Sequence, residues 1–307
     1  MTLTVVICTW DRSRLLRRCL EALCRVSPPS RAGWEILVVN NNCTDDTSEV
    51  VRSFSGRLTV REAHEPLPGL SRARNRAIQE AAGTFICWID DDILVDEGWL
   101  QAYEEAIASA PLDGIFGGPI QPIFEGERPE WLDQALPAIG GVFGVMPVHV
   151  GRIERRSSSI PFGGNMVVRT DLLRRRPFDP RLGRTAGNMM AGEEGMVLRE
   201  LLAEGVTGQW VPEARVRQII PPRMQTIDHV RRYFHDWGVS IAAVESSTGR
   251  GQLLGRPLWM WRQAFQHELM YRIGRYTSSP DRWATHLRLA SLAWGGLRRR
   301  PAKIPAS

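Results

Sequence analysis

The fold follows from the stretch Phe85-Ile86-Cys87-Trp88-Ile89-Asp90-Asp91-Asp92, an apolar run that ends at three consecutive carboxylates. Such a run predicts a buried strand whose last residue lies at the protein surface. Hard divalent cations such as Mg²⁺ prefer carboxylate oxygens and keep water and phosphate as their other ligands. The triplet therefore indicates either a metal site for chemistry on a diphosphate or a solvated turn before a helix that starts near Glu97.

Short β-rich runs alternate with helical patterns on both sides of this stretch. The predicted strands are 3–8, 35–39, 58–61 and 84–89, and the predicted helices include 15–23, 71–82 and 193–202. This alternation is typical of an α/β protein with a mainly parallel sheet that carries helices on both faces.

Polar residues follow three of the predicted strands, at Thr9–Arg12, Asn40–Asn42 and Asp90–Asp92. Ligands of open parallel sheets bind outside the carboxyl ends of the strands. We therefore expect these three segments to meet at one edge of the sheet and to form a ligand site there.

Composition restricts the class of protein further. The chain is 43% hydrophobic and 24% charged, which is ordinary for a globular protein of 307 residues. No run approaches the roughly 18 apolar residues that a membrane span needs. The pattern of residues 1–9 predicts a strand and not a signal peptide. The number and spacing of the five cysteines indicate reduced thiols and not disulfides. A cytoplasmic location, including one at the inner face of the membrane, is therefore expected.

The remaining chain has two distinctive regions. Residues 115–160 are rich in Gly and Pro, which predicts binding loops or lids. From residue 251 onward the chain has ten basic and two acidic residues, which gives this part a net charge of +8. Because the net charge of the whole chain is +5, the rest of the chain carries −3. The same tail contains aromatic and sulfur-containing residues, namely Trp259, Trp261, Trp283, Trp294, Phe265, Met270 and Tyr271. These predict either contact with an anionic bilayer interface or packing on the protein itself or on a second copy.

Seven pieces of the sequence together carry a family resemblance. They are 8–12, 39–47, 69–75, 90–92, 163–166, 178–183 and 192–194. In this order they resemble an inverting family 2 glycosyltransferase of the GT-A type. The resemblance implies a GT-A-type Rossmann-like sandwich with a C-terminal helical extension. The implied domains are a catalytic domain at 1–225, with its nucleotide-binding half at 1–115 and its acceptor-binding half at 116–225, and the extension at 226–307.

The resemblance also implies roles for individual residues. The residues that it implies for binding the sugar-nucleotide donor are Thr9, Trp10, Asp11, Arg12, Asn40, Asn42, Arg74, Asp90 and Asp91. Asp92, with Asp90, would hold Mg²⁺ or Mn²⁺ on the diphosphate. The sugar and acceptor subsites would be bordered by Gly164, Asn165 and Trp131. Glu194 would be the general base, with its neighbour Glu193 as the alternative.

Some of these side chains have a plain structural interpretation as well. Arg72, Arg74 and Arg76 would add positive charge near phosphates, or they form a solvated helix face. Glu193 and Glu194 would supply the base, or they form an acidic first helical turn that the helix dipole stabilises.

The chain departs from the family pattern at three positions. Asn40 stands where aspartate is usual. A carboxamide both donates and accepts hydrogen bonds, so it can match the N–H and the neighbouring carbonyl of uracil or thymine. This favours a UDP- or dTDP-sugar over GDP-mannose as the donor. Glu194 stands where aspartate is commoner, so the base reaches further. Gln218 stands where a histidine that can touch the metal is frequent, which predicts a weaker metal site or one that water completes.

The sequence therefore predicts metal-assisted transfer of a sugar from a nucleotide diphosphate to a hydroxyl of a glycan or lipid-linked acceptor. This activity belongs to polysaccharide or glycolipid biosynthesis for the cell envelope. A homodimer is compatible with this interpretation, and nucleic acid is not an expected partner. Two alternatives remain, a sugar-nucleotide nucleotidyltransferase and a non-catalytic nucleotide-binding module of the same fold.

Overall fold

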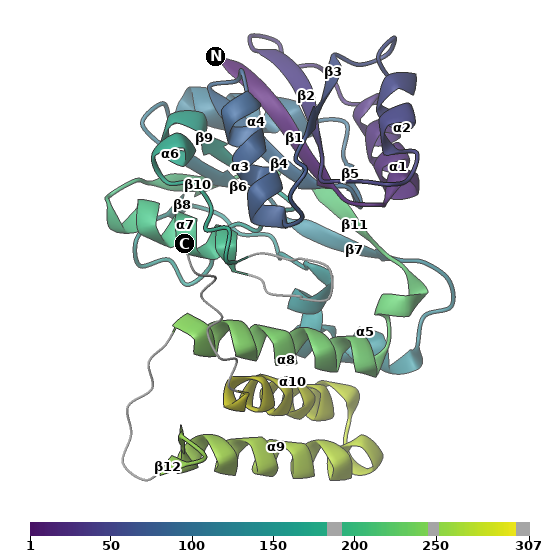
Figure 1. Ribbon diagram of the computed structural model, residues 1–307, viewed down its shortest axis with the longest axis vertical. Helices are drawn as coiled ribbons and strands as arrows, with labels where there is room; N and C mark the ends of the chain where they lie inside the picture. The colour runs from purple at the N-terminus through teal and green to yellow at the C-terminus, as the bar shows by residue number, and fades with distance from the viewer. Residues whose placement is uncertain (183–191, 245–251, 299–307) are drawn as a thin grey trace. The chain divides into compact units, whose positions relative to one another are not determined.

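The computed structural model describes residues 1–182, 192–244 and 252–298, which form two compact units (Figure 1). The sheet unit contains Met1–Ile123, residues 144–182 and Gly192–Ile219. The helical unit contains Phe124–Phe143 and the described residues from 220 onward. The predicted division at residue 225 stays a prediction, and the compact units differ from it because 124–143 groups with the C-terminal helices.

The elements of the sheet unit alternate along the chain as the sequence predicts. Its strands are β1 (Thr2–Thr9), β2 (Gly33–Asn40), β3 (Val60–His64), β4 (Phe85–Asp90), β5 (Ile93–Val95), β6 (Ile115–Gly117), β7 (Ile120–Phe124), β8 (Arg152–Ile153), β9 (Met166–Arg169), β10 (Gly208–Trp210) and β11 (Val216–Ile220). Its helices are α1 (Ser13–Leu23), α2 (Thr47–Ser53), α3 (Leu70–Glu80), α4 (Trp99–Ser109), α6 (Thr170–Arg175) and α7 (Glu193–Ala203).

Within the described residues, eight strands form the central sheet in the order β3-β2-β1-β4-β9-β6-β10-β8. The pairings β3-β2, β2-β1, β1-β4 and β6-β10 are parallel, whereas β9 runs antiparallel to β4 and β6 and β8 runs antiparallel to β10. Strands buried on both faces read as continuous apolar runs, and Val5, Val6 and Ile7 of β1 are fully buried. The predicted α/β class with a mainly parallel central sheet is confirmed.

The prediction that residues 115–160 form loops without regular structure is wrong for much of this segment. Strands β6 and β7 occupy its start, and α5 (Glu130–Ile139) and η1 (Gly140–Phe143) follow. Gly117 and Gly118 weaken the strand pattern in the sequence because the backbone is crowded there. A Cβ on Gly118, between β6 and β7, would lie 2.2 Å from the carbonyl oxygen of Ala214, so glycine is required there for close approach of the two backbones.

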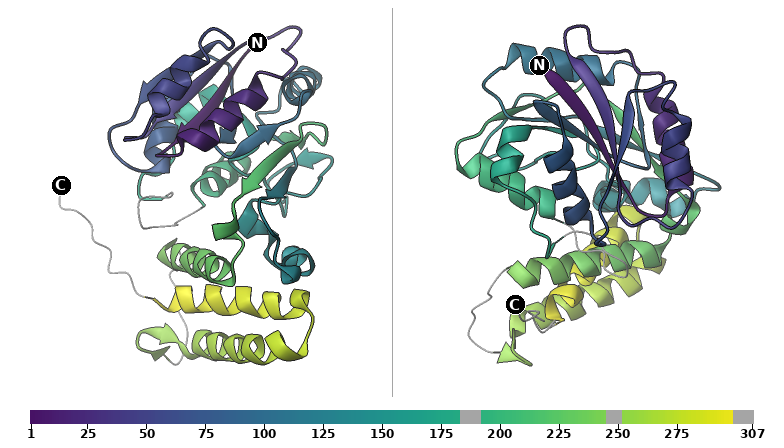
Figure 2. Two further views of the ribbon diagram at one scale, coloured as in Figure 1. Left: turned by 90° about the vertical axis from the view of Figure 1, so that its right-hand side faces the viewer. Right: turned by 45° about the horizontal axis from the view of Figure 1, so that its top comes forward.

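The helical unit is a bundle around α10 (Pro280–Leu297). It also contains η2 (Pro222–Met224), α8 (Ile227–Val244), β12 (Gln252–Leu253), β13 (Arg256–Pro257) and α9 (Leu258–Thr277). Helix α10 lies between α8 and α9, and α5 packs against α10 as well (Figures 1 and 2).

Glycines set the close spacing of α8 and α10. A Cβ on Gly238 would lie 2.2 Å from the carbonyl oxygen of Leu292, and one on Gly295 would lie 1.9 Å from that of His235. Real Cβ atoms do not come this close to backbone oxygens, so the two helix backbones are in contact only because both residues are glycine.

The aromatic residues of the tail fall into two groups, and this division bears on the two predictions made for them. Trp283 and Tyr271 are buried in the bundle, whereas Trp259 and Phe265 are more than half exposed. No helix in the described part of the chain combines the length and the apolar character that crossing a bilayer requires. Arg299, Arg300 and Lys303, which contribute to the predicted basic tail, lie outside the described residues.

Candidate active site

The structure brings the three predicted strand ends together at one edge of the central sheet. In the parallel register, Thr9 of β1 pairs with Asn40 of β2, and Cys8 pairs with Asp90 of β4. The three polar segments that follow these strands therefore lie at adjacent positions, as expected for a parallel sheet.

The Asp91 and Asp92 carboxylates share one guanidinium group. Arg12 Nη1 lies 2.7 Å from Asp91 Oδ1, and Nη2 lies 2.7 Å from Asp92 Oδ2. Thr9 donates its hydroxyl hydrogen to Asp91 Oδ2 at 2.8 Å. Both carboxylates are buried, while the Arg12 side chain is 32% exposed. Burial raises the pKa of Asp91 to about 7, against the opposing charge of Arg12. Asp91 and Asp92 therefore form a turn that is a buried charge cluster and not solvated, and Asp90 before them is half-buried.

Asp90 lies beside the predicted sugar subsite. A Cβ built on Gly164 would be 3.5 Å from Asp90 Oδ2, so the backbone of Gly164 passes directly next to this carboxylate. Burial, reinforced by the charges of Asp90 and Asp91 against that of Arg74, raises the pKa of the neighbouring Cys8 thiol to about 12. The thiol is thus neutral, and the acidic group at this position is Asp90.

A second charged group joins α3 to the start of α7. Arg74 Nη1 lies 2.5 Å from Glu193 Oε1 and 3.2 Å from Glu194 Oε2. The guanidinium carbon of Arg74 lies 5.3 Å from the ring centroid of Phe178. Arg74 and Glu193 are buried, whereas 21% of the Glu194 side chain is exposed. Of the three predicted arginines, Arg74 thus lies in the site.

The two glutamates differ in their environment. Burial, followed by the charge of Glu194, raises the pKa of Glu193 to about 8, although Arg74 opposes this shift. The raised pKa favours the protonated form of the buried Glu193, and the more accessible carboxylate of the pair is that of Glu194.

Gly163 and Gly164 connect the two charged groups. The Gly163 N–H donates to Glu194 Oε1 at 3.4 Å, and Gly164 borders Asp90 as described above. A Cβ on Gly163 would lie 2.2 Å from Arg74 Nη2. Only glycine therefore lets Arg74 reach the glutamates at this position.

Asn165, predicted to border the acceptor subsite, is fully buried. Its Nδ2 donates to the carbonyl oxygens of Pro119 and Ala214 at 3.0 and 2.8 Å. Its Oδ1 accepts from Trp99 Nε1 at 2.9 Å and from the Tyr103 hydroxyl at 2.8 Å. These four bonds use the whole capacity of the amide, so its visible role is to fix the Gly163–Gly164 turn.

Asn40 is also held within the protein. Its Nδ2 donates to Glu62 Oε1 at 2.8 Å and contacts Ser48 Oγ at 3.3 Å. Its Oδ1 accepts from the Cys43 N–H at 2.8 Å, which leaves one lone pair on that oxygen. Glu62 was missed from the sequence because its position within β3 carries no motif.

The segments after β1 and β2 form a joined pair of loops. Asp11 and Asn42 both have positive φ, 49° and 58°. Asp11 Oδ1 accepts from the Thr44 N–H at 2.6 Å, and the adjacent Trp10 is 44% exposed. Ligand atoms of Asp11, Cys43 and Asp45 lie within 4.8 Å of one another, but hydrogen bonds between the loops already use Asp11 and Asp45. Trp10 thus offers an exposed ring beside the site.

Gln218, which replaces the frequent histidine, lies next to Asp92. Its Nε2 is 3.5 Å from Asp92 Oδ1, and the Ile219 N–H donates to the Asp92 carbonyl oxygen at 2.9 Å. Strand β11 therefore contacts both the carboxylate and the backbone of Asp92.

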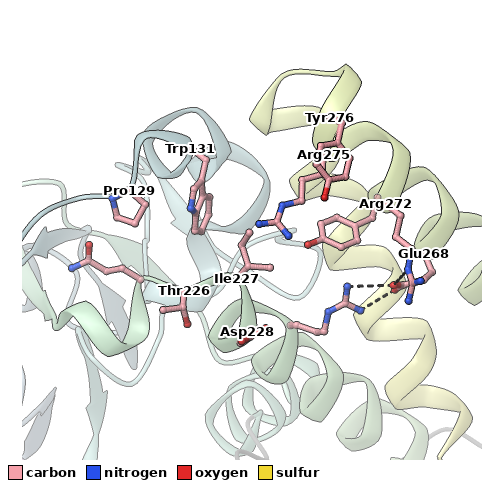
Figure 3. Close-up of a pocket in the computed structure, with 12 residues that line it drawn as sticks. Pro129, Trp131, Thr226, Ile227, Asp228, Glu268, Arg272, Arg275 and Tyr276 are labelled. Atoms are coloured by element: carbon pink, nitrogen blue, oxygen red, sulfur yellow. Dashed lines mark hydrogen bonds and ion pairs between the residues drawn. The ribbon is translucent and has the colours of Figure 1, made fainter.

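Trp131, predicted for the acceptor side, lies in the helical unit. It lines a cavity of about 820 Å³ together with residues of α8 and α9, among them Ile227, Arg231, Tyr271 and Arg275 (Figure 3). Its ring centroid is 5.5 Å from that of Trp283. In this cavity Arg231 pairs with Glu268 at 2.8 Å.

Comparison with known proteins defines the class that this site belongs to. The model of glycosyl transferase family 2 matches residues 4–176, more than half of the chain. The chain belongs to glycosyl transferase family 2. At the level of the family, the resemblance drawn from the seven sequence pieces is confirmed.

Individual relatives match only part of their own length. The succinoglycan biosynthesis protein ExoM of Rhizobium meliloti is 25% identical over 220 residues, which cover 70% of this chain and 66% of ExoM. The glycosyltransferase AglE of Haloferax volcanii is 27% identical over 120 residues, which cover 38% of this chain and 39% of AglE.

Solved structures agree in fold. The mannosyltransferase PcManGT from Pyrobaculum calidifontis, in complex with GDP-Man and Mn²⁺, aligns with a TM-score of 0.60 and 15% identity, over 96% of this chain and 86% of that one. TarS 1–349 of S. aureus, in complex with UDP-GlcNAc, aligns with a TM-score of 0.55 and 15% identity, over 90% and 73%. The GT-A-type fold is thereby confirmed.

Proposed function

We propose that this protein is an inverting glycosyltransferase that moves a sugar from a nucleotide diphosphate to an acceptor hydroxyl. The observation that carries the proposal is the Gly163–Gly164 turn. It contacts the accessible carboxylate of Glu194 on one side and Asp90 on the other. A sugar bound against this turn would lie between the base, Glu194, and the carboxylate at the end of β4, Asp90.

Glu194 is the general base in this proposal. The attacking hydroxyl loses its proton during the step, and a positioned carboxylate that accepts it contributes about 10²–10⁴-fold. Arg74 and the Gly163 N–H fix the direction of the Glu194 carboxylate. The buried proton on Glu193 keeps the pair at a single negative charge, so that Arg74 can balance it.

The leaving diphosphate requires positive charge at the other side of the sugar. The donor set fits Mg²⁺ or Mn²⁺ because it consists of the carboxylate oxygens of Asp90 and Asp92. We assign the ion to Asp92 and Asp90, where it would neutralise charge that develops on the diphosphate oxygens. Arg12 holds Asp91 and Asp92 in the absence of a donor and adds a second positive charge next to the phosphates.

We further propose a UDP- or dTDP-sugar as the donor. The free lone pair of Asn40 Oδ1 suits the single N–H of uracil or thymine, and the exposed ring of Trp10 suits stacking on a base. Glu62 is the competing feature, because a carboxylate suits the two adjacent donors of guanine. Calorimetry with UDP, dTDP and GDP tests the choice: tighter binding of GDP than of both others would reject it and point to Glu62.

The acceptor is a glycan or a lipid-linked sugar in polysaccharide or glycolipid biosynthesis. The similarity to ExoM supports the pathway class. Within the helical unit, the Trp131 cavity combines aromatic rings with arginine side chains, which suits the binding of a sugar there.

One assay tests the activity against its alternatives. Nucleoside diphosphate release is measured with a panel of sugar nucleotides and Mn²⁺, and Asp92→Ala is the variant. Transfer that requires Mn²⁺ and is lost in Asp92→Ala supports the proposal. Release of pyrophosphate from nucleoside triphosphates and sugar phosphate would indicate a nucleotidyltransferase. Nucleotide binding without any turnover would indicate a binding module.

A further inference from the structure

Helix α9 forms an outer layer of the helical unit. It packs on α10 and on the short strand β13, and α10 separates it from α8 (Figures 1 and 2). Its buried residues are Ala264, Tyr271 and Gly274, which define the inner face. The side opposite to these residues has no packing partner among the described parts of the unit.

This outer face is apolar over the length of the helix. It consists of Leu258, Trp259, Phe265, Leu269, Met270, Ile273 and Tyr276, whose exposed fractions range from 46% to 87%. Leu258, Phe265, Leu269, Ile273 and Tyr276 recur at spacings of seven, four, four and three residues, which places them along one stripe of a 3.6-residue helix. A helix of 20 residues extends this stripe over about 30 Å.

The charges on α9 are of one sign where they are exposed. Arg262 lies within the apolar stripe and Arg272 lies at its edge, and both are exposed. Arg275 is also exposed but lies on the side of the helix that lines the Trp131 cavity. The single acid of the helix, Glu268, points inward: its side chain is only 14% exposed and pairs with Arg231 at 2.8 Å and Arg272 at 2.9 Å. An occupant of the outer face must therefore be apolar at its centre and negatively charged around it.

A second copy of the chain fits this face poorly. A two-fold interface places the same patch on both partners, so the arginines of one α9 would meet those of the other, and like charges across an interface cost free energy. An anionic bilayer supplies both missing features, an acyl boundary for the apolar residues and phosphate groups for the arginines.

We propose that the outer face of α9 is the docking surface for an anionic lipid bilayer, with the helix lying parallel to the membrane plane. This surface contains no residue of the sheet unit's candidate site; among its seven apolar residues, Tyr276 also lines the Trp131 cavity. Contact with a bilayer requires no particular sugar nucleotide. It goes beyond the proposed function by placing the enzyme at a membrane surface through contact of one helix face.

The test is co-sedimentation of the whole chain with vesicles of phosphatidylglycerol and phosphatidylcholine, or of phosphatidylcholine alone. We expect sedimentation with the anionic vesicles that weakens as salt is added. The double substitution Leu269→Asn with Ile273→Asn should lower the partition coefficient at least about tenfold, because both side chains contribute apolar area to the contact. Arg262→Gln should lower it roughly fivefold on anionic vesicles only.

The matched control is Leu112→Asn, which changes an 89% exposed leucine of the sheet unit and should sediment like the unaltered chain. Binding of the nucleotide, measured on the same samples, reports on the proposed function separately. Failure of the unaltered chain to sediment, or equal sedimentation of the double variant, overturns the proposal. A dimer in light scattering that the double variant abolishes would assign the face to a second copy and overturn it as well.

Discussion

Arg12 Nη2 lies 2.7 Å from Asp92 Oδ2, on the carboxylate that is the predicted metal ligand. The same guanidinium contacts Asp91 through Nη1 at 2.7 Å. A protein cation thus occupies the position that a divalent ion would share. Binding of a metal ion at Asp92 and pairing of Asp92 with Arg12 are therefore in competition, and the moderately exposed Arg12 side chain is the partner that can move.

This competition predicts that Arg12→Ala binds Mn²⁺ more tightly than the unaltered protein when no nucleotide is present. Removal of a unit charge in contact with a carboxylate changes its affinity for another cation by about tenfold or more. Titration followed by electron paramagnetic resonance of free Mn²⁺ measures the affinity directly. Arg14→Ala is the matched control, because Arg14 is an exposed arginine in the first turn of α1, two residues after Arg12. Weaker Mn²⁺ binding by Arg12→Ala would contradict the competition.

The second prediction concerns the base. Glu194→Gln should lower the rate of transfer by about 10²–10⁴-fold, because the amide cannot accept the proton of the acceptor hydroxyl. The affinity for the nucleoside diphosphate should stay near that of the unaltered protein, because glutamine keeps the size of the side chain and retains an acceptor oxygen for Arg74 or the Gly163 N–H. Single-turnover transfer and calorimetry measure the two quantities.

Glu193→Gln separates the two glutamates. Glu193 is almost fully buried and holds its proton near neutral pH, so its amide should retain most of the transfer activity. If Glu194→Gln kept full activity while Glu193→Gln lost it, the base would be Glu193, and the assignment made here would be wrong.

The sequence predicted the edge of the site better than its interior. Apolar runs that end at Thr9, Asn40 and Asp90 are sufficient to place three segments together, because parallel pairing aligns their carboxyl ends. Family motifs indicated Glu193 and Glu194 but left open which of them is accessible. That distinction depends on burial, which the position within a motif does not reveal.

The parts that the sequence did not predict depend on long-range contacts. Nothing in the local sequence indicates that the Asn165 amide forms all four of its hydrogen bonds with distant residues, namely Pro119, Ala214, Trp99 and Tyr103. Residues 130–139 form a helix that packs on α10, although Pro137 lies within it. In both cases partners more than forty residues away decide the local structure.

The third prediction is that Glu193 makes the protein less stable as pH rises. Its pKa is about 8 in the folded protein against 4.5 for the ordinary side chain. The folded state therefore binds more protons than the unfolded state between these values, and the free energy of unfolding falls with pH, by up to about 1.4 kcal/mol per pH unit. Asp91, with its pKa raised to about 7, contributes in the same direction up to that pH.

Glu193→Gln should flatten this dependence between pH 5 and 8 because it removes one of the two groups. Urea unfolding followed by tryptophan fluorescence at several pH values gives the slope. Glu200→Gln, which changes an exposed glutamate of the same helix, should leave the slope as it is. An unchanged slope in Glu193→Gln would show that Glu193 is ionised in the folded protein at neutral pH.

The last prediction concerns Arg74, which is buried, contacts both Glu193 and Glu194, and lies over the ring of Phe178. Arg74→Met should lower the free energy of unfolding by about 3–5 kcal/mol at pH 8, because it leaves buried acidic groups without a positive partner. Arg74→Lys should recover only part of this loss, since lysine lacks the planar fork that contacts both glutamates. Arg72→Ala, an exposed arginine two residues away, should change it by less than about 0.5 kcal/mol. The loss in Arg74→Met should shrink at pH 5, where both glutamates can be protonated; an equal loss at the two pH values would mean that packing on Phe178, and not charge, is what Arg74 contributes.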